Sequence, residues 1–98
     1  MSAKAASLQL SGGRWRVAGT LSMDTVEAVL AASAAIGMPQ DGVIDLAAVD
    51  RVDSAGVALI LAWARRAATE GKQVAFAGMP ESMRALATLY GVEGLLVA

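Results

Sequence analysis

The sequence contains no histidine and no cysteine. Ser-His catalytic pairs, histidine general bases, thiolate nucleophiles, disulfides and the usual zinc sites are therefore excluded. Any catalysis would depend on carboxylates, Tyr90, lysine or arginine. This composition is compatible with a protein that is not an enzyme and that carries neither a metal nor a cofactor.

Long apolar runs and a dominant charge are also missing. The longest segment without a polar residue, residues 55–64, is half of the roughly 20 residues that a membrane-spanning helix needs. The sequence does not open with a positively charged segment, an apolar stretch and a cleavage site, so we expect a cytoplasmic protein. Eight basic residues against nine acidic ones give a formal charge of −1, which argues against nucleic acid as the main partner.

What the sequence has in plenty is apolar residues, which make up 56% of its 98 residues. A chain of this length has room for one hydrophobic core. We therefore expect residues 1–98 to form a single domain, in which residues 1–5 are flexible.

The amino-terminal part predicts a hairpin. Residues 6–10 and 14–18 both alternate between apolar and polar side chains, and Ser11-Gly12-Gly13 between them is typical of a turn. Trp15 and Val17 fall on the apolar face of the second strand. The hairpin is expected to form one edge of the fold.

A first helix is expected after the hairpin. Ser22 or Asp24 is in place to cap it, and Asp24 and Glu27 have the spacing of a capping box. Apolar residues then recur at helical spacing from Val26 until Gly37 and Pro39 end the helix.

The rest of the chain alternates between short strands and helices. We expect a strand at 43–46, a long helix at 54–69, a strand around Val74 and Phe76, and a helix from Pro80 to Tyr90. Residues 95–98 are predicted to be a fifth strand or a docked tail. This order implies an α/β fold, in which a mixed sheet of four to five strands follows from the hairpin and three helices pack on it.

Ser54 stands between several acidic residues and the apolar helix. A serine in this place commonly caps a helix, because its hydroxyl accepts a hydrogen bond from an unpaired backbone N–H. The alternative is that Ser54 is exposed and contacts a partner or takes a phosphoryl group. A helix N-terminus favours a phosphate, whereas nearby Asp50 and Asp53 would repel it. The sequence leaves both interpretations open.

Asp45, Asp50 and Asp53 also raise the possibility of a catalytic or magnesium site. No glycine-rich phosphate loop precedes a helix here, and no lysine or histidine stands beside these aspartates. An acidic turn between a strand and a helix is the simpler interpretation.

The helix at 54–69 is apolar on nearly every face and therefore needs two covers. One stripe, which we expect to pack on the sheet, consists of Val57, Ile60, Leu61, Ala64 and Ala68. Leu59, Ala62, Trp63 and Arg66 lie on other faces. Their cover is either the next helix, with Met83, Leu86 and Tyr90, or another protein, since an aromatic beside an arginine is typical of interface anchors.

The segments "VIDLAAVDRVDSAGVALIL" and "GKQVAFAGMPESMRALATLYGVEGLL" together resemble the STAS domain. This is the module of anti-sigma-factor antagonists and of sulfate-transporter tails. The resemblance covers nearly the whole chain, and its most specific piece is Asp53-Ser54-Ala55-Gly56. It implies the STAS fold for residues 1–98.

Two branches of the family compete. In anti-sigma-factor antagonists the residue at the position of Ser54 is the phosphoacceptor. Those proteins usually continue with Gly-Leu-Gly, where Gly56 is here followed by Val57-Ala58, and they tend to have Phe-Asp where this chain has Leu89-Tyr90. The runs "SAGVALIL" and "ALATLYGVEGLL" are more similar to the MlaB branch, the cytoplasmic STAS subunit of the Mla ABC transporter of Gram-negative bacteria.

The resemblance to the MlaB branch implies a non-enzymatic subunit that binds and stabilises or regulates a MlaF-like ATPase. The complex would include permease and substrate-binding subunits and would move phospholipid between membranes, which maintains outer-membrane lipid asymmetry. The chain itself would be peripheral to the inner membrane, without membrane insertion. The expected contact residues are Arg51, Asp53, Ser54, Ala55, Gly56, Val57 and Trp63. The alternative is an anti-sigma-factor antagonist switched by a serine kinase through Ser54.

Overall fold

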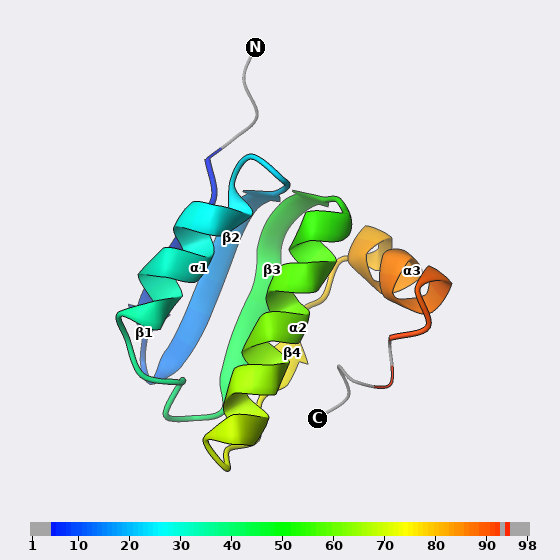
Figure 1. Cartoon of the computed structure of the whole chain (residues 1–98). Coiled ribbons are helices and arrows are strands. Elements are labelled where there is room, and N and C mark those ends of the chain that lie inside the picture. The colour runs from blue at the N-terminus through cyan, green and yellow to red at the C-terminus, as the bar shows by residue number, and fades with distance from the viewer. Residues whose placement is uncertain (1–4, 93, 95–98) are drawn as a thin grey trace.

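The computed structural model describes residues 5–92 and residue 94. The elements along the chain are β1 (Ser7–Ser11), β2 (Arg14–Leu21), α1 (Val26–Ala34), β3 (Val43–Val52), α2 (Ser54–Thr69), β4 (Ala75–Ala77) and α3 (Glu81–Leu89). The strands form one sheet in the order β1-β2-β3-β4 (Figure 1). This confirms the predicted α/β architecture with an amino-terminal hairpin and three helices.

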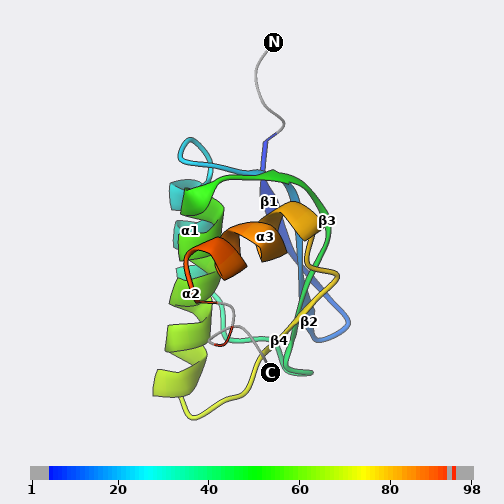
Figure 2. The same ribbon diagram turned by 90° about the vertical axis from the view of Figure 1, so that its right-hand side faces the viewer.

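The sheet is mixed, with α1 and α2 on one face of it and α3 running between α2 and β3 (Figure 2). β1 and β2 pair antiparallel, whereas β2 with β3 and β3 with β4 pair parallel. Figure 2 shows the sheet edge-on, with α1 and α2 in a layer on one face. The predicted fifth strand or tail at residues 95–98 lies outside the described residues. Within the described part of the chain, no helix is long and apolar enough to cross a bilayer.

Strand alternation places the core between the sheet and the helices. Trp15 and Val17 of β2 and Ile44 and Leu46 of β3 have no exposed surface, while Arg16 between the first pair is exposed. α2 covers these side chains with its own buried residues, which are Gly56, Val57, Leu59, Ile60, Trp63 and Ala67.

The buried face of α2 differs from the predicted stripe. Val57 and Ile60 are buried as expected, but Leu61 is only partly buried and Ala68 is exposed. Leu59, Trp63 and Ala67 are buried in their place, and they follow one another at the helical spacing of four residues. The residues on both stripes are apolar, so periodicity alone could not choose between them. The rotation that buries the largest side chain, Trp63, is the one adopted.

Two boundaries also differ from the predictions. β3 was expected to end at residue 46 but continues to Val52. The reason is that β2 continues to Leu21, where Thr20 pairs with Arg51 and Leu21 pairs with Val52. The predicted capping box at the start of α1 is wrong, since Thr25 is the N-cap and its side chain makes no capping hydrogen bond. The predicted bounds of α2 are confirmed.

Candidate functional site

Asp53, and not Ser54, caps α2. The Asp53 Oδ1 atom accepts hydrogen bonds from the backbone N–H groups of Ala55 at 2.8 Å and Gly56 at 3.4 Å. Asp53 has the extended backbone typical of an N-cap, and Ser54 is the first helical residue. The capping role that the sequence suggested for the serine is therefore filled by its neighbour.

Ser54 is left at the surface. Its side chain is exposed, and among the described residues its hydroxyl has no hydrogen-bond partner. The hydroxyl therefore stands at a fixed place on the first turn of a 16-residue helix, available to a molecule outside the chain. Of the two interpretations left open above, the geometry agrees with the second.

The other carboxylate oxygen of Asp53 ties a neighbouring loop to the site. Asp53 Oδ2 accepts a hydrogen bond from the backbone N–H of Met23 at 3.1 Å. The loop between β2 and α1 is further fixed by Thr25, whose hydroxyl donates to the Thr20 carbonyl at 2.6 Å and accepts from the Ser22 N–H at 2.9 Å. Met23 is thus held beside the start of α2 although its side chain is 78% exposed.

Sequence reasoning missed Met23. The residue lies 30 positions from Asp53, and only the meeting of the β2 and β3 ends brings the two together. No local pattern around Met23 signals this contact. The candidate site is therefore made of two segments, the β2–α1 loop and the first turn of α2.

Gly56 and Val57 lie beneath the site and not at its surface. Both are buried, which corrects their assignment as contact residues. A Cβ atom on Gly56 would lie 2.6 Å from Val52 Cγ2 and 2.9 Å from the Leu21 carbonyl oxygen, so only glycine lets α2 start this close to the strand ends. These two residues position Ser54, while Ala55 is partly exposed beside it.

Trp63 is likewise a core residue, and its assignment as a partner anchor was wrong. It is 1% exposed, and its ring meets that of Trp15 edge-on with 5.4 Å between centroids. Its indole N–H donates to Ser33 Oγ at 2.9 Å, which in turn donates to the Leu30 carbonyl at 2.7 Å. α1 therefore covers Trp63, and not the helix with Met83, Leu86 and Tyr90 or the partner protein that the sequence analysis considered.

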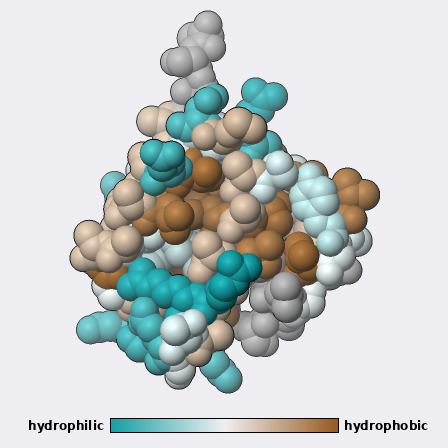
Figure 3. Space-filling view, in the orientation of Figure 1, coloured by the Kyte–Doolittle hydropathy of each residue, from teal (hydrophilic) through white to brown (hydrophobic). Residues whose placement is uncertain are grey.

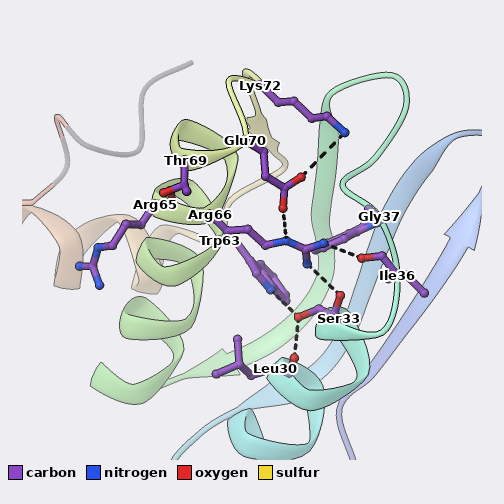
Figure 4. A network of polar contacts seen from close by, with 11 residues as sticks. Leu30, Ser33, Ile36, Gly37, Trp63, Arg65, Arg66, Thr69, Glu70 and Lys72 are labelled. Atoms are coloured by element: carbon purple, nitrogen blue, oxygen red, sulfur yellow. Dashed lines mark hydrogen bonds and ion pairs between the residues drawn. The ribbon is translucent and has the colours of Figure 1, made fainter.

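Arg66 completes this polar network between α1 and α2 (Figure 4). Its guanidinium donates to the carbonyl of Ser33 at 2.9 Å, in the last turn of α1, and to the carbonyl of Ile36 at 2.6 Å, just beyond the helix. The Ser33 carbonyl also accepts from the Ile36 N–H at 3.2 Å. The same guanidinium hydrogen-bonds Glu70 at 2.8 Å and so lowers the pKa of that carboxyl group. The aromatic and arginine pair that suggested an interface thus fixes α1 against α2.

The three aspartates considered for a metal or catalytic site do not converge. Asp45 accepts from the Ala47 N–H and faces Arg16 at 3.6 Å, Asp50 accepts from the Thr20 hydroxyl at 3.0 Å, and Asp53 caps α2. In residues 5–92 and 94, no three carboxylates are grouped so that they could hold a metal ion. Arg51, the expected rim residue, is exposed at the end of β3.

Comparison with known proteins gives the family. The sequence matches the family model described as MlaB, STAS domain, over residues 5–98. No curated protein sequence matches it significantly. Among solved structures, the crystal structure of an anti-sigma-factor antagonist STAS domain from Rhodobacter sphaeroides is similar, with a TM-score of 0.58 and 26% sequence identity. The similarity covers 76% of this chain and 86% of that one. The chain therefore belongs to the STAS domain family described by the MlaB model.

Proposed function

We propose that this protein is a non-enzymatic STAS subunit that binds and regulates the ATPase of an Mla-type ABC transporter. In this role it is cytoplasmic and is held at the inner membrane by the transporter complex. The complex would move phospholipid between membranes and so maintain outer-membrane lipid asymmetry. The family match supports this proposal through its MlaB description and its coverage of residues 5–98.

The observation that carries the proposal is the exposed Ser54 hydroxyl in a rigid frame. Asp53 fixes both the start of α2 and the β2–α1 loop, so the surface around Ser54 is ordered before any partner arrives. A preorganised surface loses little conformational entropy when it binds. The exposed Met23 side chain beside it adds apolar area of a type enriched at interfaces. This arrangement suits protein docking.

The test is binding to the purified MlaF-like ABC ATPase of the organism that encodes this chain. Ser54→Glu is expected to weaken binding by at least about tenfold, because the added carboxylate would be desolvated within the interface and repelled by Asp53. Ser54→Ala should have a smaller effect, since it removes only the hydroxyl. Isothermal titration calorimetry with the two purified proteins would measure both.

Ser82→Glu is the matched control, because Ser82 is an exposed serine in the first turn of another helix, α3. It should leave the affinity unchanged. If Ser54→Glu and Ser54→Ala both bind like the wild type, the assigned role of this hydroxyl is wrong. If the wild-type chain does not bind the ATPase, the proposed function is wrong.

A phosphorylation-switched anti-sigma-factor antagonist is the second candidate. It is favoured by the similarity to the Rhodobacter sphaeroides structure and by the exposure of Ser54. A phosphate on Ser54 would find the N–H groups of Ala55 and Gly56 already bonded to the Asp53 carboxylate. It would add negative charge there and would eject a bound partner. Stoichiometric phosphate on Ser54 after incubation with a cognate serine kinase, detected by mass spectrometry, would favour this candidate.

A further inference from the structure

One flank of the molecule, made of β1 and the part of α1 that follows Glu27, carries no charge. Residues 5–13 and 28–40 contain no aspartate, glutamate, lysine or arginine. The two elements contact each other, and Figure 1 shows them together at one side of the fold. Figure 3 shows mostly tan and brown side chains over α1. Exposed apolar patches commonly mark sites of protein contact.

β1 is also an unprotected sheet edge. It pairs with β2 on one side, and no strand of the described chain pairs with its other side. Natural edge strands usually avoid further pairing by carrying a lysine, a proline or a bulge. β1 has none of these, since its five residues pair with β2 in unbroken register. Its free edge can therefore accept another strand.

The sequence of β1 indicates which strand this is. Ser7-Leu8-Gln9-Leu10-Ser11 reads the same in both directions. An antiparallel pair of two such strands, related by a two-fold axis through Gln9, places Ser7 opposite Ser11 and Leu8 opposite Leu10. Every residue then faces a residue of its own kind. We propose that β1 pairs with β1 of a second copy of this chain and joins the two sheets into one.

The exposure of the leucines agrees with this pairing. Leu8 and Leu10 point to the same face of the sheet, but Leu8 packs against the core whereas Leu10 is 62% exposed. In the pair, Leu10 of each copy lies against Leu8 of the other, so the apolar row continues across the axis. Cross-strand contact thus covers the exposed leucine that the single chain leaves in water.

A hollow lies beside Leu10, between the hairpin turn and the loop that follows α1. It has a volume of about 330 Å³ and is lined by Leu10, Gly13, Gly37, Met38, Pro39 and Gln40. Continued one residue beyond each end of β1, the two-fold register brings Ala6 of the second copy opposite Gly12, which adjoins the lining residue Gly13. Small side chains at both positions allow close approach. A self-pairing strand is independent of the ATPase-binding role, because Ser54 and Met23 lie outside the β1 and α1 flank.

Cysteine cross-linking tests both the contact and its register. The chain has no cysteine, so a single introduced thiol can form a disulfide only with the same thiol of a second molecule. In Gln9→Cys the two thiols face each other across the axis, with Cα atoms about 4.5–5.5 Å apart. Disulfides need about 4.4–6.8 Å. Mild oxidation at high protein concentration should therefore convert most of this variant into a covalent dimer on non-reducing gels.

Ser7→Cys is the matched control, because the two copies of residue 7 are separated by four residues along the strands, or about 14 Å. It should not cross-link alone, but it should do so when mixed with Ser11→Cys. Light scattering should show the wild type becoming dimeric with rising concentration and Leu10→Lys staying monomeric. The proposal is wrong if Gln9→Cys cross-links no better than Ser7→Cys, or if the wild type stays monomeric at about 1 mM, where even weak contacts form.

Discussion

Replacing Trp63 by alanine is expected to lower the free energy of unfolding by about 4 kcal/mol. The side chain is 1% exposed, so its removal leaves a cavity between α1, α2 and β2. It also removes the edge-on contact with Trp15 and leaves the Ser33 hydroxyl without its donor. A domain of this size has about 5–15 kcal/mol in all, so the variant should be close to unfolding. Urea denaturation followed by circular dichroism measures the loss.

Two further variants show which part of Trp63 matters. Trp63→Phe keeps a ring but removes the indole N–H, and should cost about half as much as alanine, since the hydrogen bond to Ser33 and part of the ring volume are lost. Leu89→Ala, at a side chain that is 75% exposed, should change stability by less than about 0.5 kcal/mol. A stable Trp63→Ala variant that has lost only partner binding would contradict the placement of Trp63 in the core.

Replacing Asp53 by alanine is expected to cost about 2 kcal/mol, because one side chain serves two elements. Loss of an N-cap costs about 1 kcal/mol, and loss of the hydrogen bond to Met23 costs about as much again. The variant should also bind the ATPase more weakly, since the β2–α1 loop and the first turn of α2 are no longer held together. Thermal denaturation and calorimetry of binding measure the two effects.

Asparagine at the same position separates the two roles. Its amide oxygen still caps α2, but its NH₂ group cannot accept the hydrogen bond from the Met23 N–H. Asp53→Asn should therefore lose less stability than Asp53→Ala and still weaken binding. Asp24→Ala, at a neighbouring exposed aspartate, is the control and should be nearly neutral. If Asp53→Ala is as stable as Asp24→Ala, the hydrogen bonds from Asp53 to the start of α2 and to Met23 contribute nothing to stability.

Local patterns in the sequence were enough to predict most of the elements. The bounds of α2 were predicted correctly, because an aspartate-serine start and Gly71 punctuate a long apolar run. Alternation around Trp15 and Val17 correctly gave the inner face of β2. The mixed sheet with three helices packed on it followed from the order of the strands and helices along the chain, whereas the order of the strands within the sheet was not predicted.

The details that sequence reasoning missed all depend on contacts between distant segments. The length of β3 depends on pairing with β2, and so the exposed Arg51 belongs to a strand and not to a turn. The buried face of α2 depends on α1, which offers Ser33 to the Trp63 indole. Asp53 could be identified as a cap only once its oxygens were seen to reach both Ala55 and Met23. Each of these features is thus determined by a contact with a segment about 30 residues away or with the neighbouring strand of the sheet.

Hydrogen–deuterium exchange of the chain with and without the ATPase subunit tests the central claim most directly. We expect binding to slow exchange in the β2–α1 loop around Met23 and in the first two turns of α2, from Ser54 onward. Exchange in α3 should stay unchanged. Protection confined to α3 or to the open face of the sheet, with Ser54 and Met23 exchanging as in the free chain, would contradict the claim that this surface binds the ATPase.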